Sequence, residues 1–113
     1  MNPIVKEQQY ERNGIIVTRH MYWCPGCDSV HAIAIRPSVN DNGAGWTWDG
    51  NLEKPTYEPS QLTKYTYGAE GNKRTEICHT FIRQGKIQYL SDCTHSMAGQ
   101  TVEMQPLPDW ALS

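Results

Sequence analysis

The sequence predicts an all-β fold, mainly antiparallel, in one small domain that spans residues 1–113 and has little or no helix. Short segments rich in β-branched and aromatic residues alternate with turns of glycine, asparagine, aspartate and proline. No stretch shows the 3.6-residue apolar period of an amphipathic helix. Two clusters of cysteine and histidine offer a metal site that would stabilise a core of modest size. We therefore expect a β domain held together by zinc.

The first half of the chain predicts two strands around a sharp turn. Asn13-Gly14 supplies the positive φ angles of a hairpin turn, and residues 2–10 before it form at most a short edge strand. Residues 15–22 follow as a strand rich in β-branched side chains. Cys24-Pro25-Gly26-Cys27 then turns the chain into a second strand at residues 29–36. This order of strand, knuckle and strand is typical of zinc ribbons and rubredoxin-like knuckles.

The second half of the chain is centred on a β-hairpin at residues 78–95, whose turn is Gln84-Gly85. Pro55 and Pro59 push their preceding residues into extended geometry, so the segment around them is not helical. We interpret this segment as a recognition loop or as an extended strap over a sheet edge. The other expected elements are a loop at residues 37–45, an aromatic strand at 46–51, a strand at 61–67 and a last strand at 101–104.

The central hairpin brings two Cys/His pairs to one end of the molecule. Cys78-His79 lies at the start of the hairpin and Cys93-Thr94-His95 at its end, so antiparallel pairing places them together. The Cys-x-x-Cys knuckle is positioned to meet them, and structural zinc normally takes four sulfur or nitrogen ligands. Our leading set of Zn2+ ligands is Cys24, Cys27, Cys78 and His95.

Other ligand sets stay open. Cys93 would complete a four-cysteine set, and His79 is a further competing ligand. Cys78 and His79 are neighbours on a strand and face opposite sides, so they should not both bind one ion. Asp92 is expected either to orient a ligand histidine from outside the coordination shell or to close a turn through its side chain.

Some residues near these clusters have simpler interpretations. His31 shares its strand face with Ile33 and Ile35, so we expect a partly buried packing histidine rather than a ligand. His20 lies on the preceding strand and is assigned a structural or surface role. A redox role for the Cys-x-x-Cys pair is disfavoured, because thioredoxin-like motifs open a helix within a βαβ pattern and a strand follows here.

Charge and hydropathy narrow the class of function. Lys plus Arg number 10 and Asp plus Glu 12, so the formal net charge of −2 argues against nucleic-acid binding. The first thirty residues show no signal-peptide pattern, and the longest apolar runs, such as Ala32-Ile33-Ala34-Ile35, are too short to span a membrane. We expect a cytoplasmic protein, where reduced thiols favour a metal over disulfides.

Six motifs support a resemblance to a known family: Cys24-Pro25-Gly26-Cys27, Trp46-x-Trp48-Asp49-Gly50, Lys54-Pro55-Thr56-x-x-Pro59-Ser60, Cys78-His79-x-Phe81, Gly85-x-Ile87 and Asp92-Cys93-Thr94-His95-x-Met97-Ala98-Gly99. In their order and spacing, over nearly the whole chain, the sequence resembles the small phage and prophage proteins grouped as DUF6527, which have no established activity. The resemblance implies a bacterial host cell and a metal-dependent or adaptor role beside ubiquitin-like conjugation genes. It also favours His95 over Cys93, because that family accepts serine at the position of Cys93.

Together these observations favour a non-enzymatic, zinc-binding phage or prophage accessory protein that binds a host or phage macromolecule through an unidentified protein partner. The alternative is a metal-dependent, peptidase-like hydrolase that uses His79, Asp92 and His95 around an ion with an open position. Two thiolate ligands weaken this alternative, because they reduce the Lewis acidity of zinc. Nucleic-acid binding is a third reading, weakened by the net charge. The sequence leaves the oligomeric state open.

Overall fold

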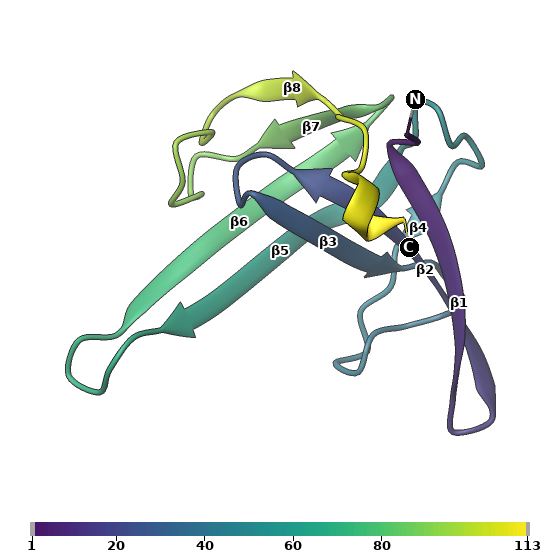
Figure 1. The fold of residues 1–113 in the computed structure, drawn as a ribbon, viewed down its shortest axis with the longest axis horizontal. Helices are drawn as coiled ribbons and strands as arrows, with labels where there is room; N and C mark the ends of the chain where they lie inside the picture. The colour runs from purple at the N-terminus through teal and green to yellow at the C-terminus, as the bar shows by residue number, and fades with distance from the viewer. Residues whose placement is uncertain (1, 113) are drawn as a thin grey trace.

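The computed structural model describes residues 2–112, and their strands form two antiparallel sheets (Figure 1). One sheet has the order β1-β2-β3 and the other the order β4-β5-β6-β7-β8. The predicted all-β fold is therefore confirmed. The elements are β1 (Val5–Arg12), β2 (Ile15–Cys24), β3 (Ser29–Ala34), β4 (Thr47–Trp48), β5 (Tyr57–Tyr67), β6 (Arg74–Arg83), β7 (Lys86–Tyr89), β8 (Thr101–Glu103) and the single 3-10 turn η1 (Asp109–Ala111).

Two tight turns form where the sequence predicts them. Asn13 and Gly14 have φ angles of 53° and 79° between β1 and β2, and Gln84 and Gly85 have 51° and 75° between β6 and β7. Positive φ at both central residues is the conformation whose twist matches that of the flanking strands. These two turns set the register of the two hairpins in which they lie.

The structure differs from the sequence-based expectation mainly in strand length. β1 extends over eight residues and pairs along its whole length with β2, although its side chains are largely polar. Backbone pairing with β2 stabilises it where composition gives little signal. β5 already begins at Tyr57, within the proline-rich segment, and η1 lies in a segment expected to be irregular.

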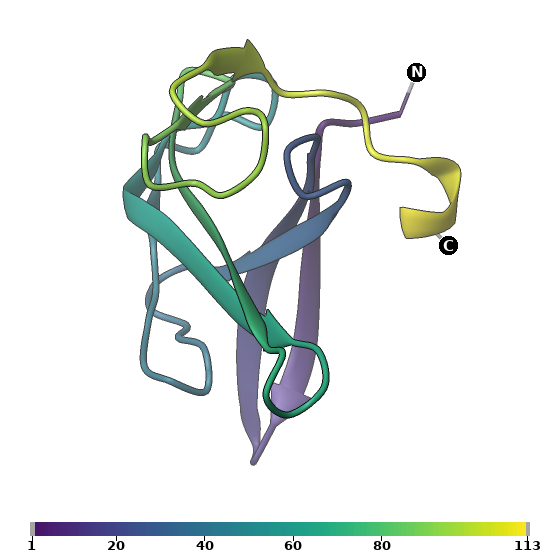
Figure 2. The same cartoon turned by 90° about the vertical axis from the view of Figure 1, so that its left-hand side faces the viewer.

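The core lies between the two sheets, which Figure 2 shows beside each other. Its largest side chains are aromatic and aliphatic and come from both sheets: Tyr22, Ile33, Tyr57, Ile82, Ile87 and Tyr89. The chain ends are joined beside this core, where the Leu107 amide donates to the Pro3 carbonyl at 2.9 Å. No helix within residues 2–112 has the length and apolar character needed to cross a membrane.

Candidate active site

Ser60, His79 and Asp92 form a continuous hydrogen-bonded chain. Ser60 Oγ lies 3.1 Å from His79 Nε2, and His79 Nδ1 lies 3.0 Å from Asp92 Oδ2. A carboxylate accepts at Nδ1 only if that nitrogen carries the proton, so Nε2 is left as the acceptor for the Ser60 hydroxyl. The three side chains are thus arranged as nucleophile, base and orienting acid.

Ser60 is presented by an irregularity in β5. Tyr57 pairs with Ile82 and Gln61 pairs with Thr80, so four steps along β5 correspond to two steps along β6. The extra residues leave the regular ladder, and bulges of this kind re-aim side chains next to functional sites. Trp46 Nε1 donates to the Ser60 carbonyl oxygen at 3.3 Å and ties the bulge to the chain before β4.

His79 lies in the middle of β6, where exposure alternates along the strand. Cys78 and Thr80 are buried, and the His79 side chain between them is 24% exposed. The backbone of His79 is held by the segment after β7: its carbonyl accepts from the Leu90 amide at 2.9 Å. The His79 amide donates to Cys93 Sγ at 3.2 Å. The Cys93 thiol in turn donates to the His79 carbonyl oxygen at 3.3 Å.

Asp92 is placed by the same segment. Thr94 donates its amide to the Ile77 carbonyl at 3.0 Å, and its hydroxyl accepts from the Ile77 amide at 3.0 Å. These bonds continue the pairing along β6 and set the turn that carries Asp92 next to His79. The Asp92 side chain is 52% exposed, so this end of the hydrogen-bonded chain is open to solvent.

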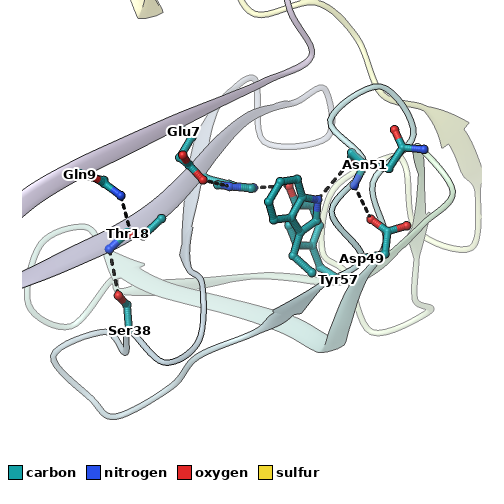
Figure 3. A network of polar contacts seen from close by, with 9 residues as sticks. Glu7, Gln9, Thr18, Ser38, Asp49, Asn51 and Tyr57 are labelled. Carbon is teal, nitrogen blue, oxygen red and sulfur yellow. Dashed lines mark hydrogen bonds and ion pairs between the residues drawn. The ribbon is translucent and has the colours of Figure 1, made fainter.

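The structure has a second chain of acid, histidine and hydroxyl groups, but its hydroxyl is buried and cannot act as a nucleophile on a substrate. His20 Nδ1 lies 2.6 Å from the Tyr57 hydroxyl, and His20 Nε2 lies 3.1 Å from Glu7 Oε1 (Figure 3). His20 is 0% exposed and Tyr57 is 2% exposed, so no substrate reaches them. This chain satisfies buried polar groups of the core, whereas the Ser60 chain lies at the surface.

The cysteine cluster lies on the other face of β6. The ligand atoms of Cys24, Cys27, His31 and Cys78 all lie within 4.8 Å of one another, and Cys24 Sγ is 3.9 Å from Cys78 Sγ. Sulfur atoms at that separation suit a tetrahedral zinc site with bonds of about 2.3 Å. The Tyr89 hydroxyl, 3.2 Å from Cys24 Sγ, also accepts from the Gly26 amide at 3.3 Å.

The electrostatics of this cluster also favour a cation. Hydrogen bonds from Cys27 and Cys78 hold the pKa of the Cys24 thiol well below its ordinary value. Burial by itself lowers the pKa of His31, but hydrogen bonds to Cys24 and Cys27 outweigh it and raise the pKa to about 9. The same contacts with Cys24 and Cys27 raise the pKa of the Cys78 thiol, so the thiolate character is concentrated on Cys24. A thiolate beside further thiols and an imidazole is the donor chemistry of a zinc or iron site.

A second group shares one member with the first. Cys78, Cys93 and His95 also lie within 4.8 Å of one another, with His95 Nε2 3.4 Å from Cys78 Sγ. The His95 ring covers Gly26 so closely that a Cβ there would collide with it. His95 thus packs directly on the knuckle.

The residues singled out from the sequence are distributed over these sites. Cys24, Cys27 and Cys78 meet between the sheets, and His95 belongs to the second group. His79 bonds Ser60 and Asp92 through its two ring nitrogens, so Asp92 orients His79. Two residues of these groups were not among the candidates chosen from the sequence. His31 was interpreted as a packing histidine, although its place on the inward strand face was a signal, and Ser60 had no local signal beyond its motif.

One comparison with known proteins gives a match. Residues 3–90 match the family described as BubE, bacterial ubiquitination-like system serine protease. The match includes Ser60 and His79 and ends before Asp92. No curated protein and no solved structure matches the chain.

Proposed function

Because the chain belongs to the BubE family of bacterial ubiquitination-like system serine proteases, we propose that it is itself a serine protease. Ser60 is the nucleophile, His79 is the general base and Asp92 orients and stabilises the imidazole. The observation that supports this proposal is the chain of two hydrogen bonds at 3.1 Å and 3.0 Å that joins these side chains.

Family membership corrects three expectations drawn from the sequence. The matching family is BubE, so the resemblance to DUF6527 was wrong. The phage or prophage assignment was wrong for the same reason. The non-enzymatic accessory role was also wrong, because the family is one of proteases. The peptidase alternative was closer to the family, although it assigned the chemistry to a metal.

The proposed reaction uses the triad in two steps. The Ser60 hydroxyl attacks the carbonyl carbon of an amide and gives its proton to His79 Nε2, and Asp92 stabilises the resulting imidazolium. The imidazolium then protonates the leaving amine, so the C–N bond breaks and an acyl ester remains on Ser60. Water, deprotonated by the same imidazole, hydrolyses the ester and restores the hydroxyl.

The chemistry of the cysteine cluster argues against a metal-centred mechanism. Two of its three thiols are buried, with Cys24 1% and Cys78 3% exposed, and an ion held by three thiolates is a weak Lewis acid. His79, which that mechanism would need as a ligand, has both ring nitrogens in hydrogen bonds within the triad.

We assign the cluster a structural Zn2+ instead. Cys24, Cys27 and Cys78 are three proposed ligands, and His31 is the fourth, because it lies in one group with all three. The amide nitrogen of Gln61 lies 3.5 Å from His31 Nδ1, so Gln61 packs directly against the ring. His95 is the competing fourth ligand, through its contact of 3.4 Å with Cys78.

A ubiquitination-like system implies protein partners. We propose that the substrate is a protein of that system, cleaved at a peptide or isopeptide bond. All four cysteines are free thiols, which suits the reducing bacterial cytoplasm that we propose as the place of action.

Covalent labelling tests the proposal directly. A small alkyl fluorophosphonate carries no peptide and reacts with an activated serine far faster than with an ordinary serine hydroxyl, so we expect one adduct per chain, located on Ser60 by peptide mass spectrometry. Ser60→Ala should abolish labelling, and Ser91→Ala, at an exposed serine next to Asp92, is the matched control that should not. A folded wild-type protein that takes up no label would overturn the proposal.

A further inference from the structure

The strand that carries Ser60 has one unpaired edge. β4 pairs with Tyr57 and Glu58 of β5, so from Gln61 to Tyr67 β5 pairs with β6 alone among the strands of residues 2–112. β3 is the outer strand of the other sheet and pairs with β2. An unpaired edge presents backbone donors and acceptors to a further strand.

The register identifies which groups of β5 are free. In an antiparallel pair, the N–H and C=O of one residue point to the same side and alternate along the strand. The carbonyls of Ile77 and His79 accept amides from the segment after β7, so they point away from β5. Leu62 is opposite His79 and Lys64 is opposite Ile77. The N–H and C=O of Leu62 and Lys64 therefore point away from β6, toward the unpaired edge.

A groove follows this edge and reaches Ser60. A pocket of about 410 Å³ is lined by Ala32 on one side and Leu62 on the other, and reaches Ser60 and Trp46. A second pocket of about 300 Å³ continues between β3 and β5. Ala32, Gln61 and Thr63 line both pockets, so the two are parts of one groove between the edges of β3 and β5.

We propose that this groove binds the substrate as an extended polypeptide segment that pairs with the free edge of β5 at Leu62 and Lys64 and so delivers its scissile carbonyl to Ser60. This inference rests on the proposed protease function. The pairing would use backbone groups alone, as in other peptide sites that add a strand to a sheet edge.

Charge defines the segment further. Among the described residues that line the two pockets, Arg36 carries the only charge of a Lys, Arg, Asp or Glu side chain. Lys64 is exposed at the adjoining edge. The groove therefore fits a neutral or acidic segment that extends away from its own fold, such as a tail or linker.

Two probes of Ser60 separate binding at the edge from the chemistry of the triad. The small alkyl fluorophosphonate needs only the triad, whereas an acetyl-tetraalanyl diphenyl phosphonate also places a peptide in the groove. We expect Leu62→Pro to slow labelling by the peptidyl probe about fivefold, the effect of one lost hydrogen bond. Labelling by the small probe should stay within about twofold of wild type. Proline is accepted here because the lost N–H does not bond β6.

Leu62→Ala is the matched comparison, since it removes the side chain and keeps the backbone N–H, so it should slow the peptidyl probe less than Leu62→Pro does. A second experiment uses wild-type protein, so its result does not depend on the folding of a variant. The peptidyl probe is methylated at its backbone nitrogens, and we expect it to label Ser60 about fivefold more slowly than the unmethylated probe. If neither Leu62→Pro nor methylation of the peptidyl probe slows its labelling of Ser60, while the small probe labels normally, the edge-binding inference alone is overturned. If the small probe does not label the wild-type protein, the proposed protease function is overturned as well.

Discussion

Cys78 and His79 are consecutive residues of β6 whose side chains lie on opposite faces of the sheet. The Cys78 thiol is buried in the cysteine cluster, 3.9 Å from Cys24 Sγ, and the His79 ring lies on the outer face in contact with Ser60. Alternation along a strand requires this separation. One strand therefore positions both the proposed zinc site and the proposed base. A substitution or a loss of metal on one face of β6 should alter the geometry on the other face.

Loss of the metal should therefore reduce the reactivity of Ser60. We expect the purified protein to contain about one zinc per chain, by elemental analysis. Removal of zinc with a chelator should lower the melting temperature and slow fluorophosphonate labelling, because ligand binding free energy is folding free energy in small domains. Cys27→Ser should reproduce both effects. A metal-free protein with unchanged melting and labelling would contradict the zinc assignment.

The fourth ligand can be identified by comparing two histidine variants. His31→Ala should lower zinc content and stability more than His95→Ala, because His31 lies in one group with all three thiols. Substitution of zinc by cobalt gives a second measure, since the visible spectrum reports the number of sulfur and nitrogen ligands. A cobalt spectrum altered by His95→Ala and not by His31→Ala would make His95 the ligand.

Asp92 should act on the reaction through His79. Asp92→Asn keeps the size of the side chain and removes the charge that stabilises the imidazolium, so we expect labelling of Ser60 to slow by about 100-fold or more. The melting temperature should change little, because Asp92 is half exposed. Asp41→Asn, at another exposed aspartate, is the control and should label normally. Equal labelling of the two variants would remove Asp92 from the triad.

The sequence identified the fold and the local motifs better than the assembled site. Cys24 and Cys27 are readable because their spacing and turn are local. Ser60 and His79 are nineteen residues apart on neighbouring strands, and only the bulge in β5 brings them together. No local pattern encodes that shift of register. His31 was correctly placed on the inward strand face, but the same face that packs the core also lines the cysteine cluster.

Cys93 should support His79 without binding metal. Its sulfur contacts both the amide and the carbonyl of His79, at 3.2 Å and 3.3 Å. Cys93→Ala leaves these groups without that partner, so we expect a loss of about 1–3 kcal/mol in the free energy of unfolding. Zinc content should remain near one per chain, and Cys93→Ser should retain most of the stability through its hydroxyl. Denaturant unfolding and elemental analysis measure both quantities, and a loss of zinc in Cys93→Ala would return Cys93 to the ligand set.

Tyr57 offers a test of whether the two acid-histidine-hydroxyl chains differ in role. Tyr57→Phe removes the partner of His20 Nδ1 in the core, where His20 is fully buried. An unpaired buried acceptor or donor costs about 1–3 kcal/mol, so denaturant unfolding should show a loss of that size. Labelling of Ser60 should persist at temperatures where the variant is folded, in contrast to Ser60→Ala, which should keep its stability and lose the label. A folded Tyr57→Phe protein that no longer reacts would mean that the buried chain contributes to catalysis.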